Sequence, residues 1–317
     1  NPTHKLLQDE SQIEFILVHD IFMNTSARYA DLLLPDRTAF EREELGRSGT
    51  VMGDRLYYTP PAITPLYDTR DAYELCLGVA KQLGIGEQFS EGRTAQQWQE
   101  YMVEQARKRN PNFPTLAELK QKPVIKSQAK KPVVALTAFL ADPEKNKLRT
   151  PSGKIEIYSD RLAKMGQDWG IPDELPPIPK YIPAWEGPES PLREKYPLQC
   201  IGHHTKRRVH STHDNNPWME EVEPQAVGIN EIDAAERGIR DGDLVKVWND
   251  RGEIHLPAMV TKTIMPGVVN IPQGGWFTPD KNGVDVRGCI NTITKYHPTP
   301  GAKGNPQHTN LVKIAKL

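Results

Sequence analysis

The last third of the chain alternates short apolar runs with turn signals. The segments 240–243 and 249–252 combine Asp or Asn with glycine, as tight turns between strands do, and 232–237 predicts a short helix that ends at Gly238. Six short strands and one helix within about 120 residues favour a small closed β-barrel over a large sandwich. The predicted strands are 198–201, 226–229, 244–248, 253–260, 267–271 and 311–314.

The first third of the chain has a different pattern, in which short strands and helices are mixed. The apolar run 13–18 predicts a buried strand with His19 and Asp20 at its carboxyl end, and 31–35 predicts a second strand. Ligands gather at the carboxyl ends of strands in α/β sheets, so this edge is a candidate binding site. Helices are predicted at 24–30, 70–84 and 95–108.

Between these parts, residues 109–195 hold many prolines and few periodic apolar patterns. One hairpin-like element is predicted at 150–158. Long segments of this kind wrap between domains or cover a site. We therefore expect three divisions: an α/β part at 1–108, a proline-rich connecting segment at 109–195 and the barrel at 196–317.

Composition and charge narrow the class of protein. Lys and Arg number 40 against 41 Asp and Glu, and the formal net charge is −1. This balance argues against a dedicated nucleic-acid-binding protein and against a polybasic membrane protein. No apolar run approaches the roughly 20 residues that a membrane-spanning helix needs. The chain starts at Asn1 without a signal-like segment, so we expect a piece of a longer protein.

The three cysteines, Cys76, Cys200 and Cys289, are far apart in the sequence and form no CxxC motif. This spacing excludes a zinc ribbon, a ferredoxin-type cluster and a dithiol redox motif within the chain. An odd and sparse set of cysteines does not predict a disulfide framework, and it leaves the redox compartment open.

The densest group of chemically capable residues is 202–213, Gly-His-His-Thr-Lys-Arg-Arg-Val-His-Ser-Thr-His. It follows a predicted strand, so we expect a loop at that strand's carboxyl end. Cations, hydroxyls and free backbone amides suit a pyrophosphate, which predicts a loop for a phosphate-bearing cofactor. The residues alone leave two alternatives: a solvated basic loop and, less favoured, a zinc site, for which clustered histidines are poorly spaced.

Four stretches, taken in series, resemble the carboxyl-terminal part of the catalytic subunit in the dimethyl sulfoxide reductase family of molybdopterin oxidoreductases. The resemblance is strongest to the membrane-associated anaerobic A-chain branch, and it covers 109–195 only weakly. The stretches are His19–Pro35 followed by Glu41, Gly202–His213, Ile229–Ile239 continued by 242–243 and 249–252, and Pro266–Val312 with Gln273–Trp276 inside it.

The resemblance implies a bis-molybdopterin guanine dinucleotide cofactor held between α/β domains and a terminal double-psi β-barrel. The implied fold class is thus mixed α/β plus β: a partial, Rossmann-like cofactor domain followed by a six-stranded barrel. Asp20 would accept the hydrogen-bond donors on the guanine edge, and His19 would contact the cofactor. Without the resemblance, an aspartate after a strand is most often a turn or cap residue.

The same resemblance implies that His203–Ser211 runs along the pterin and the pyrophosphate, with Lys206 and Arg207 as direct contacts. Arg208 would pair instead with the acidic run 220–223. Amide side chains donate and accept together, which suits a pterin or guanine edge, although Asn291 and Asn310 also fit a turn and a strand start. The implied cofactor-binding residues are His19, Asp20, His203, His204, Thr205, Lys206, Arg207, His210, Ser211, Asn291 and Asn310.

Several conspicuous residues have structural explanations. The turns 241–243 and 249–252 need glycine, Glu41 is expected to anchor the loop after the second strand, and Trp276 fits the core or the surface better than a substrate funnel. The family often has proline where Glu231 stands here, so the turn that opens the barrel helix is expected to differ slightly.

By resemblance, the whole protein reduces an S-oxide or N-oxide by oxygen-atom transfer in anaerobic respiration. It would work with an iron–sulfur electron-transfer subunit and a membrane anchor on the extracytoplasmic face. The molybdenum ligand and the cysteines of a [4Fe-4S] cluster are expected upstream, so this chain alone should be inactive. The alternatives are a formate dehydrogenase or a nitrate-, selenate- or polysulfide-type reductase with the same cofactor, and an anion- or nucleic-acid-binding barrel led by 206–208.

Overall fold

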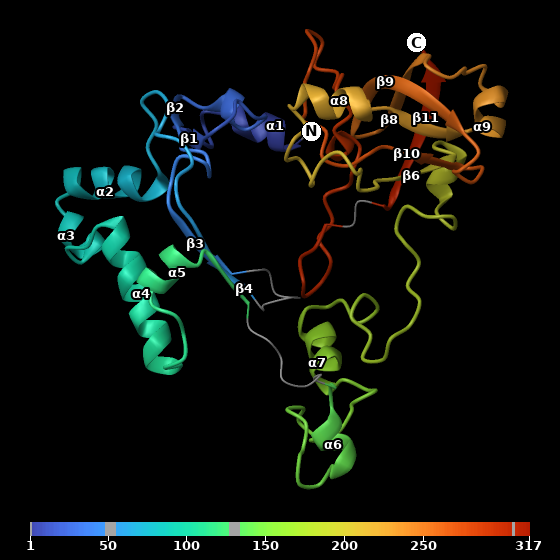
Figure 1. The fold of residues 1–317 in the computed structure, drawn as a ribbon. Helices are drawn as coiled ribbons and strands as arrows, with labels where there is room; N and C mark the ends of the chain where they lie inside the picture. The colour runs from blue at the N-terminus through green and yellow to red at the C-terminus, as the bar shows by residue number, and fades with distance from the viewer. Residues whose placement is uncertain (1, 48–54, 127–133, 306–307) are drawn as a thin grey trace. The chain divides into compact units, whose positions relative to one another are not determined.

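The computed structural model describes residues 2–47, 55–126, 134–305 and 308–317. The chain divides into two compact units, Glu10–Leu136 and a second unit that joins Asn1–Asp9 to Thr137–Leu317. Figure 1 shows the elements of each unit. The domain boundaries expected at 108/109 and 195/196 stay predictions, since the units are defined by contacts alone.

The second unit contains the barrel (Figure 1). Its six strands close in the order β10-β6-β11-β8-β9-β7, with β6 parallel to β10 and β7 parallel to β9, while the other neighbours are antiparallel. Each strand lies at a predicted apolar run, so the closed six-stranded barrel is confirmed. The strands are β6 (Leu198–Ile201), β7 (Val227–Asn230), β8 (Leu244–Asn249), β9 (Gly252–Thr261), β10 (Val268–Asn270) and β11 (Asn310–Lys316).

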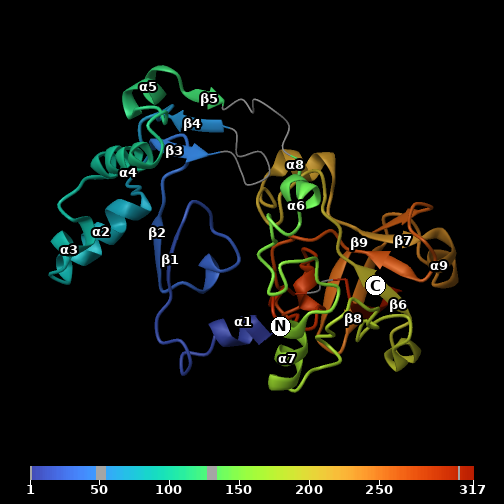
Figure 2. The same cartoon turned by 90° about the horizontal axis from the view of Figure 1, so that it is seen from below.

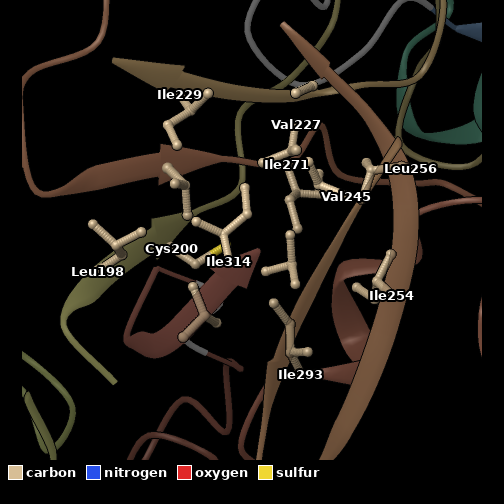
Figure 3. Close-up of a cluster of buried hydrophobic side chains, with 14 of the residues drawn as sticks. Leu198, Cys200, Val227, Ile229, Val245, Ile254, Leu256, Ile271, Ile293 and Ile314 are labelled. Atoms are coloured by element: carbon tan, nitrogen blue, oxygen red, sulfur yellow. The ribbon is translucent and has the colours of Figure 1, made fainter. Parts of the chain in front are cut away.

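Alternation along the strands builds the barrel core. On β8, Val245 and Val247 are fully buried while Lys246 between them is partly exposed, and Ile254 and Leu256 repeat the pattern on β9. Side chains of successive strand residues point to opposite faces, so this period of two sends one set inward. Figure 3 shows these side chains meeting those of β6 and β7 in a common interior.

The predicted helix after β7 is also confirmed, as α9 (Glu231–Glu236) (Figure 2). The side chain of Asn230 accepts the backbone N–H of Ile232 at 2.9 Å and so caps the helix. Gly238, at φ 63°, ends it in the left-handed conformation. Glu231 occupies the first helical position, where a carboxylate is favourable to the helix dipole.

The first unit begins with a two-stranded parallel sheet of β1 (Leu17–Asp20) and β2 (Leu32–Pro35). The second strand and the position of His19 and Asp20 at the carboxyl end of the first are as predicted. The expected strand over 13–18 is misplaced: the Asp31 carboxylate accepts the backbone N–H of Ile16 at 2.7 Å, and regular pairing starts only at Leu17. The predicted helix at 24–30 shrinks to one 3₁₀ turn, Ala27–Tyr29.

Two longer helices of this unit follow the prediction. They are α2 (Ala72–Gln82), capped by Asp71, and α4 (Ala95–Arg109), which opens with a capping box of Thr94 and Gln97. A three-stranded antiparallel sheet packs Tyr58 against Val103 and Leu119. Its strands are β3 (Glu44–Arg47), β4 (Arg55–Thr59) and β5 (Val124–Lys126). Besides α9, the short α-helices in the described ranges are α1 (Pro2–Leu7), α3 (Gly86–Ser90), α5 (Leu116–Gln121), α6 (Thr137–Ala141), α7 (Asp160–Asp168) and α8 (Pro217–Val222).

The segment 109–195 is less irregular than expected at its start, because α5 and β5 join the first unit. The hairpin predicted at 150–158 is wrong. Gly153 donates to the carbonyl of Thr150 in a turn, but the apolar residues that follow, Ile155 and Ile157, are 63% and 76% exposed and pair with no strand among the described residues. Across the described ranges no helix is long and apolar enough to cross a bilayer.

The cysteines differ sharply in environment. Burial raises the pKa of Cys200 to about 12 and, together with the charge of Asp285, raises that of Cys289 to about 11, whereas Cys76 is exposed. Since the thiolate is the reactive form, we expect iodoacetamide at about pH 8 to alkylate only Cys76 in the folded chain, and all three in urea. Peptide mass spectrometry reads this out, and labelling of Cys200 in the folded chain would contradict the buried assignment.

Candidate functional site

The cation- and histidine-rich loop leaves the barrel where two parallel strands end together. β6 stops at Ile201 and its parallel neighbour β10 at Asn270, so 202–214 and the segment after β10 emerge at one edge. The backbone N–H of Gln273 donates to the carbonyl of His203 at 3.0 Å and ties the two segments together. The loop predicted at a strand's carboxyl end is therefore confirmed.

Two glycines after β10 let this loop lie directly on the segment. A Cβ on Gly274 would stand 1.8 Å from the carbonyl oxygen of His210, and one on Gly275 would stand 2.7 Å from the carbonyl oxygen of Gly288. Gly274 also has φ +92°, which other residues rarely adopt. Only glycine fits at 274 and 275, between the loop on one side and the 287–288 backbone on the other. The Gln-Gly-Gly-Trp sequence therefore allows these backbones to approach each other closely.

A buried cluster of charges holds the end of the loop. Asp214, whose side chain is 1% exposed, pairs with the guanidinium Nη1 of Arg208, accepts the backbone N–H of Trp276 at 3.0 Å and accepts Nε of Arg287 at 3.0 Å. Arg208 donates its remaining N–H groups to Gln225 Oε1 at 2.6 Å and to backbone carbonyls of the segment after β10. Asp214 therefore joins three separate stretches of chain.

Arg207 turns into the same cluster. Its Nη1 lies 2.8 Å from the Glu220 carboxylate, which also lies 3.0 Å from Nη2 of Arg287. Glu220 is thus paired by Arg207 and Arg287, so the expected pairing of Arg208 with 220–223 is wrong. Arg208 pairs with Asp214 instead, and because both side chains are only 1% exposed, each is the counter-charge that the other needs. Three guanidinium groups face two carboxylates here.

Burial and charge act in opposite directions on these guanidinium groups. Burial lowers the pKa of Arg208, while Asp214 raises it in part. For Arg287 burial also lowers the pKa, but the hydrogen bond and charge of Asp214, together with Glu220, raise it overall. Both groups remain cations, because a guanidinium does not lose its proton in proteins.

The remaining loop residues lie on the outer side. Lys206, His204, His210 and Ser211 are exposed, and the His204 and His210 rings meet edge-on at 4.9 Å between centroids. His210 has φ 52°, a strained conformation for a non-glycine residue, and its Nδ1 lies 3.1 Å from Nε2 of Gln273. The structure therefore exposes four of the predicted loop residues and brings His204 and His210 together.

Two other loop residues are less exposed. His203 Nδ1 forms a hydrogen bond with Oδ1 of Asn270, at the end of β10. Thr205 is 8% exposed, and its hydroxyl has no hydrogen-bond partner among the residues that the structure describes. A buried hydroxyl without a partner is costly, so this atom fits a site that a polar group completes.

Asn310 and Asn291 lie near the start of the loop. Asn310 opens β11, is fully buried and stands opposite Cys200 on β6. Asn291 is exposed in the 3₁₀ helix Ile290–Thr292, which packs against the loop because a Cβ on Gly202 would stand 2.9 Å from Cδ1 of Ile290. The His308 ring accepts the N–H of Gly202 at 3.2 Å and adds a link to the same place.

His19 and Asp20 belong to the first unit, where Asp20 makes a local turn. Its two carboxylate oxygens accept the backbone N–H of Phe22 at 3.1 Å and Nδ2 of Asn24 at 2.6 Å. His19 Nε2 lies 2.9 Å from the carbonyl oxygen of Arg70. The turn role of Asp20 is therefore present, and its carboxylate keeps further lone pairs for a ligand. The cofactor roles of both residues stay predictions.

Glu41 anchors its loop as expected. Its carboxylate accepts the N–H and hydroxyl of Thr38, both at 2.7 Å, and the N–H of Leu66 at 2.6 Å. These hydrogen bonds, led by that of Leu66, lower the pKa of Glu41. The anchor therefore holds while the carboxylate is ionised, and it weakens as the pH falls through that lowered pKa.

The sequence reasoning missed Asp214, a single aspartate just after the histidine-rich run. Its signal was the need of a buried arginine for a counter-charge, since arginines are rarely buried unpaired. Trp276 is half-buried and donates its indole N–H to the carbonyl of Ser211 at 2.9 Å, so it braces the loop. No group of three or more His, Cys, Asp or Glu side chains that could hold a metal occurs within the described part of the chain.

The sequence was found to be similar to known proteins. Residues 198–311 match the family model "Molydopterin dinucleotide binding domain", which covers the barrel and its loop. The whole chain is 43% identical to dimethyl sulfoxide reductase DmsA of Escherichia coli and spans 39% of it. It is 32% identical to a dimethyl sulfoxide/trimethylamine N-oxide reductase of Cereibacter sphaeroides, with 99% of this chain and 39% of that protein covered.

A solved structure shares the fold. Acetylene hydratase from Pelobacter acetylenicus superimposes with a TM-score of 0.71 and 19% identity, over 96% of this chain and 40% of that one. The chain spans about two fifths of the length of the curated relatives that it matches. The barrel and its loop are thus a molybdopterin dinucleotide-binding domain, and the whole chain is similar to the carboxyl-terminal two fifths of dimethyl sulfoxide reductases DmsA.

Proposed function

We propose that this chain is a cofactor-binding part of a molybdenum oxidoreductase that reduces an S-oxide or N-oxide by oxygen-atom transfer in anaerobic respiration. The observation that carries this is the 43% identity to a dimethyl sulfoxide reductase along the whole chain, at a barrel edge that gathers cations, imidazoles and hydroxyls. The molybdenum ligand and the [4Fe-4S] cysteines belong to residues outside this sequence, so the chain alone is inactive.

The residues present fit Mo-bis(molybdopterin guanine dinucleotide). The partnerless hydroxyl of Thr205 and the exposed ammonium of Lys206 suit the pterin and pyrophosphate, with His203, His210 and Ser211 beside them. Asp20 would receive the guanine edge, as a carboxylate accepts two N–H donors at once. When bound, the cofactor supplies the redox and oxygen-transfer chemistry, and the protein orients it. Arg207 as a direct contact stays a prediction, because its guanidinium faces Glu220 here.

The partners belong to the same proposal. An electron source is required for every reduced substrate molecule, and an iron–sulfur subunit with a membrane anchor would supply it at the extracytoplasmic face. The support is the resemblance of the loop and barrel sequences to the membrane-associated A-chain branch of the family. A small S-oxide or N-oxide is the proposed substrate, and no nucleic acid is expected to bind.

A chimeric enzyme tests the proposal. Residues 1–317 replace the matching stretch of Escherichia coli DmsA, and the chimera is assayed for anaerobic growth with dimethyl sulfoxide as the only electron acceptor. We expect growth, and guanine nucleotide released by acid hydrolysis in the amount found for the parent enzyme. Lys206→Ala should lower the guanine content by about tenfold, as the loss of a charged contact does. A chimera that carries guanine nucleotide without reducing S-oxides or N-oxides would retain the cofactor assignment and refute the substrate.

A further inference from the structure

A second ion pair, between a buried carboxylate and a partly buried guanidinium, lies at the barrel, outside the cofactor loop. Glu186 comes from the proline-rich segment, and only 3% of its surface is exposed. Both of its carboxylate oxygens accept hydrogen bonds from Arg251: Nη1 donates to Oε1 at 2.6 Å and Nη2 donates to Oε2 at 2.8 Å. Arg251 stands in the turn between β8 and β9, so the pair fastens the connecting segment to the barrel.

The same two side chains reach the elements that carry Asn291 and Asn310. Glu186 Oε2 also accepts the backbone N–H of Leu311 at 3.0 Å, directly after Asn310. Nε of Arg251 donates to the carbonyl of Ile293 at 2.7 Å, at the end of the 3₁₀ helix that contains Asn291. The pair therefore holds the start of β11 and the end of this helix at once.

Neighbouring residues reinforce the arrangement. Nδ2 of Asn249 donates to the carbonyls of Ile293 at 2.8 Å and Leu311 at 3.2 Å. A Cβ on Gly252 would stand 2.7 Å from the carbonyl oxygen of Thr292, so the helix rests directly on the turn. The turn between β8 and β9 therefore also supports the 3₁₀ helix Ile290–Thr292.

We propose that Glu186 and Arg251 are positioning residues for cofactor binding, which set the places of Asn291 and Asn310 without touching the cofactor themselves. The inference rests on the proposed function. Burying the Glu186 carboxylate costs solvation free energy that its ion pair only partly returns, which makes conformational specificity a reason to keep the pair. Bidentate geometry gives the pair a defined direction that an apolar contact would lack.

The test compares the DmsA chimera with its Glu186→Gln and Arg251→Lys variants. Glu186→Gln removes the charge and keeps an acceptor for Leu311, while Arg251→Lys keeps the charge and loses the bidentate contact. We expect each to release the cofactor about tenfold faster, measured as guanine nucleotide lost on dilution, because residues behind the direct contacts commonly have effects of this size. Hydrogen exchange of the 290–293 and 310–312 amides should quicken in parallel.

Asp250→Asn is the matched control. It lies in the same turn, loses its exposed ion pair with Lys195 and keeps an oxygen for the hydroxyl of Tyr196, so it should change neither cofactor release nor exchange at 290–293. If the two variants exchange faster at these amides but hold the cofactor as well as the parent chimera, the pair is only structural and the inference is wrong. If the parent chimera carries no guanine nucleotide, the proposed function itself fails, which the first measurement distinguishes.

Discussion

Replacement of Asp214 with alanine is expected to lower the free energy of unfolding by about 3–5 kcal/mol, the range found when one partner of a buried ion pair is removed. Arg207 and Arg208 have side chains only 1% exposed, so water cannot replace the lost carboxylate. Trp276 would also lose the acceptor for its backbone N–H. Urea unfolding followed by tryptophan fluorescence measures the effect.

Two further variants serve as controls for the loss of stability expected of Asp214→Ala. Asp214→Asn keeps an acceptor for the N–H of Trp276 and removes only the charge, so its loss should be smaller than that of Asp214→Ala. Lys262→Ala, at an 82% exposed side chain that pairs loosely with Glu231, should stay within about 0.5 kcal/mol of the parent. A loss below about 1 kcal/mol for Asp214→Ala would show that the cluster is hydrated in solution and does not hold the loop.

The barrel could be predicted because its signals are local. Alternating apolar residues, an Asn cap at Asn230 and a left-handed Gly238 each act within a few residues, and they agree with one another. Pairing partners are not local. The hairpin expected at 150–158 had the right alternation but pairs with no strand in the described part of the chain, while Val124–Lys126 pairs with β4 across a long stretch of sequence.

The position of the loop could be predicted from the sequence, but the orientation of its side chains could not. That the loop follows β6 could be read from the sequence, because the strand before it was clear. The orientations of the three consecutive cations could not be predicted, because an irregular loop lacks the repeating side-chain directions of a helix or a strand. Lys206 faces outward while Arg207 and Arg208 face inward, and the difference depends on Asp214, Glu220 and distant parts of the barrel.

Gly274→Ala should be destabilising by about 3–5 kcal/mol, from backbone strain at φ +92° and from overpacking against the His210 carbonyl, which stands 1.8 Å from the new Cβ position. Because the new Cβ would collide with backbone atoms of the loop, we expect the loop to move away from the segment after β10. We therefore expect amide hydrogen exchange over 203–214 to quicken more than exchange in β8, and cofactor retention in the chimera to fall with it.

Gly242→Ala separates the two causes of that loss. Gly242 has φ +80° and no atom within 4 Å of its Cβ position, so alanine there adds strain without a collision and should cost about 1–2 kcal/mol. The difference between the two variants measures the close approach of the loop alone. Equal losses would mean that the loop does not rest on Gly274 in solution, and that this contact does not fix the positions of His203, Thr205 and Lys206.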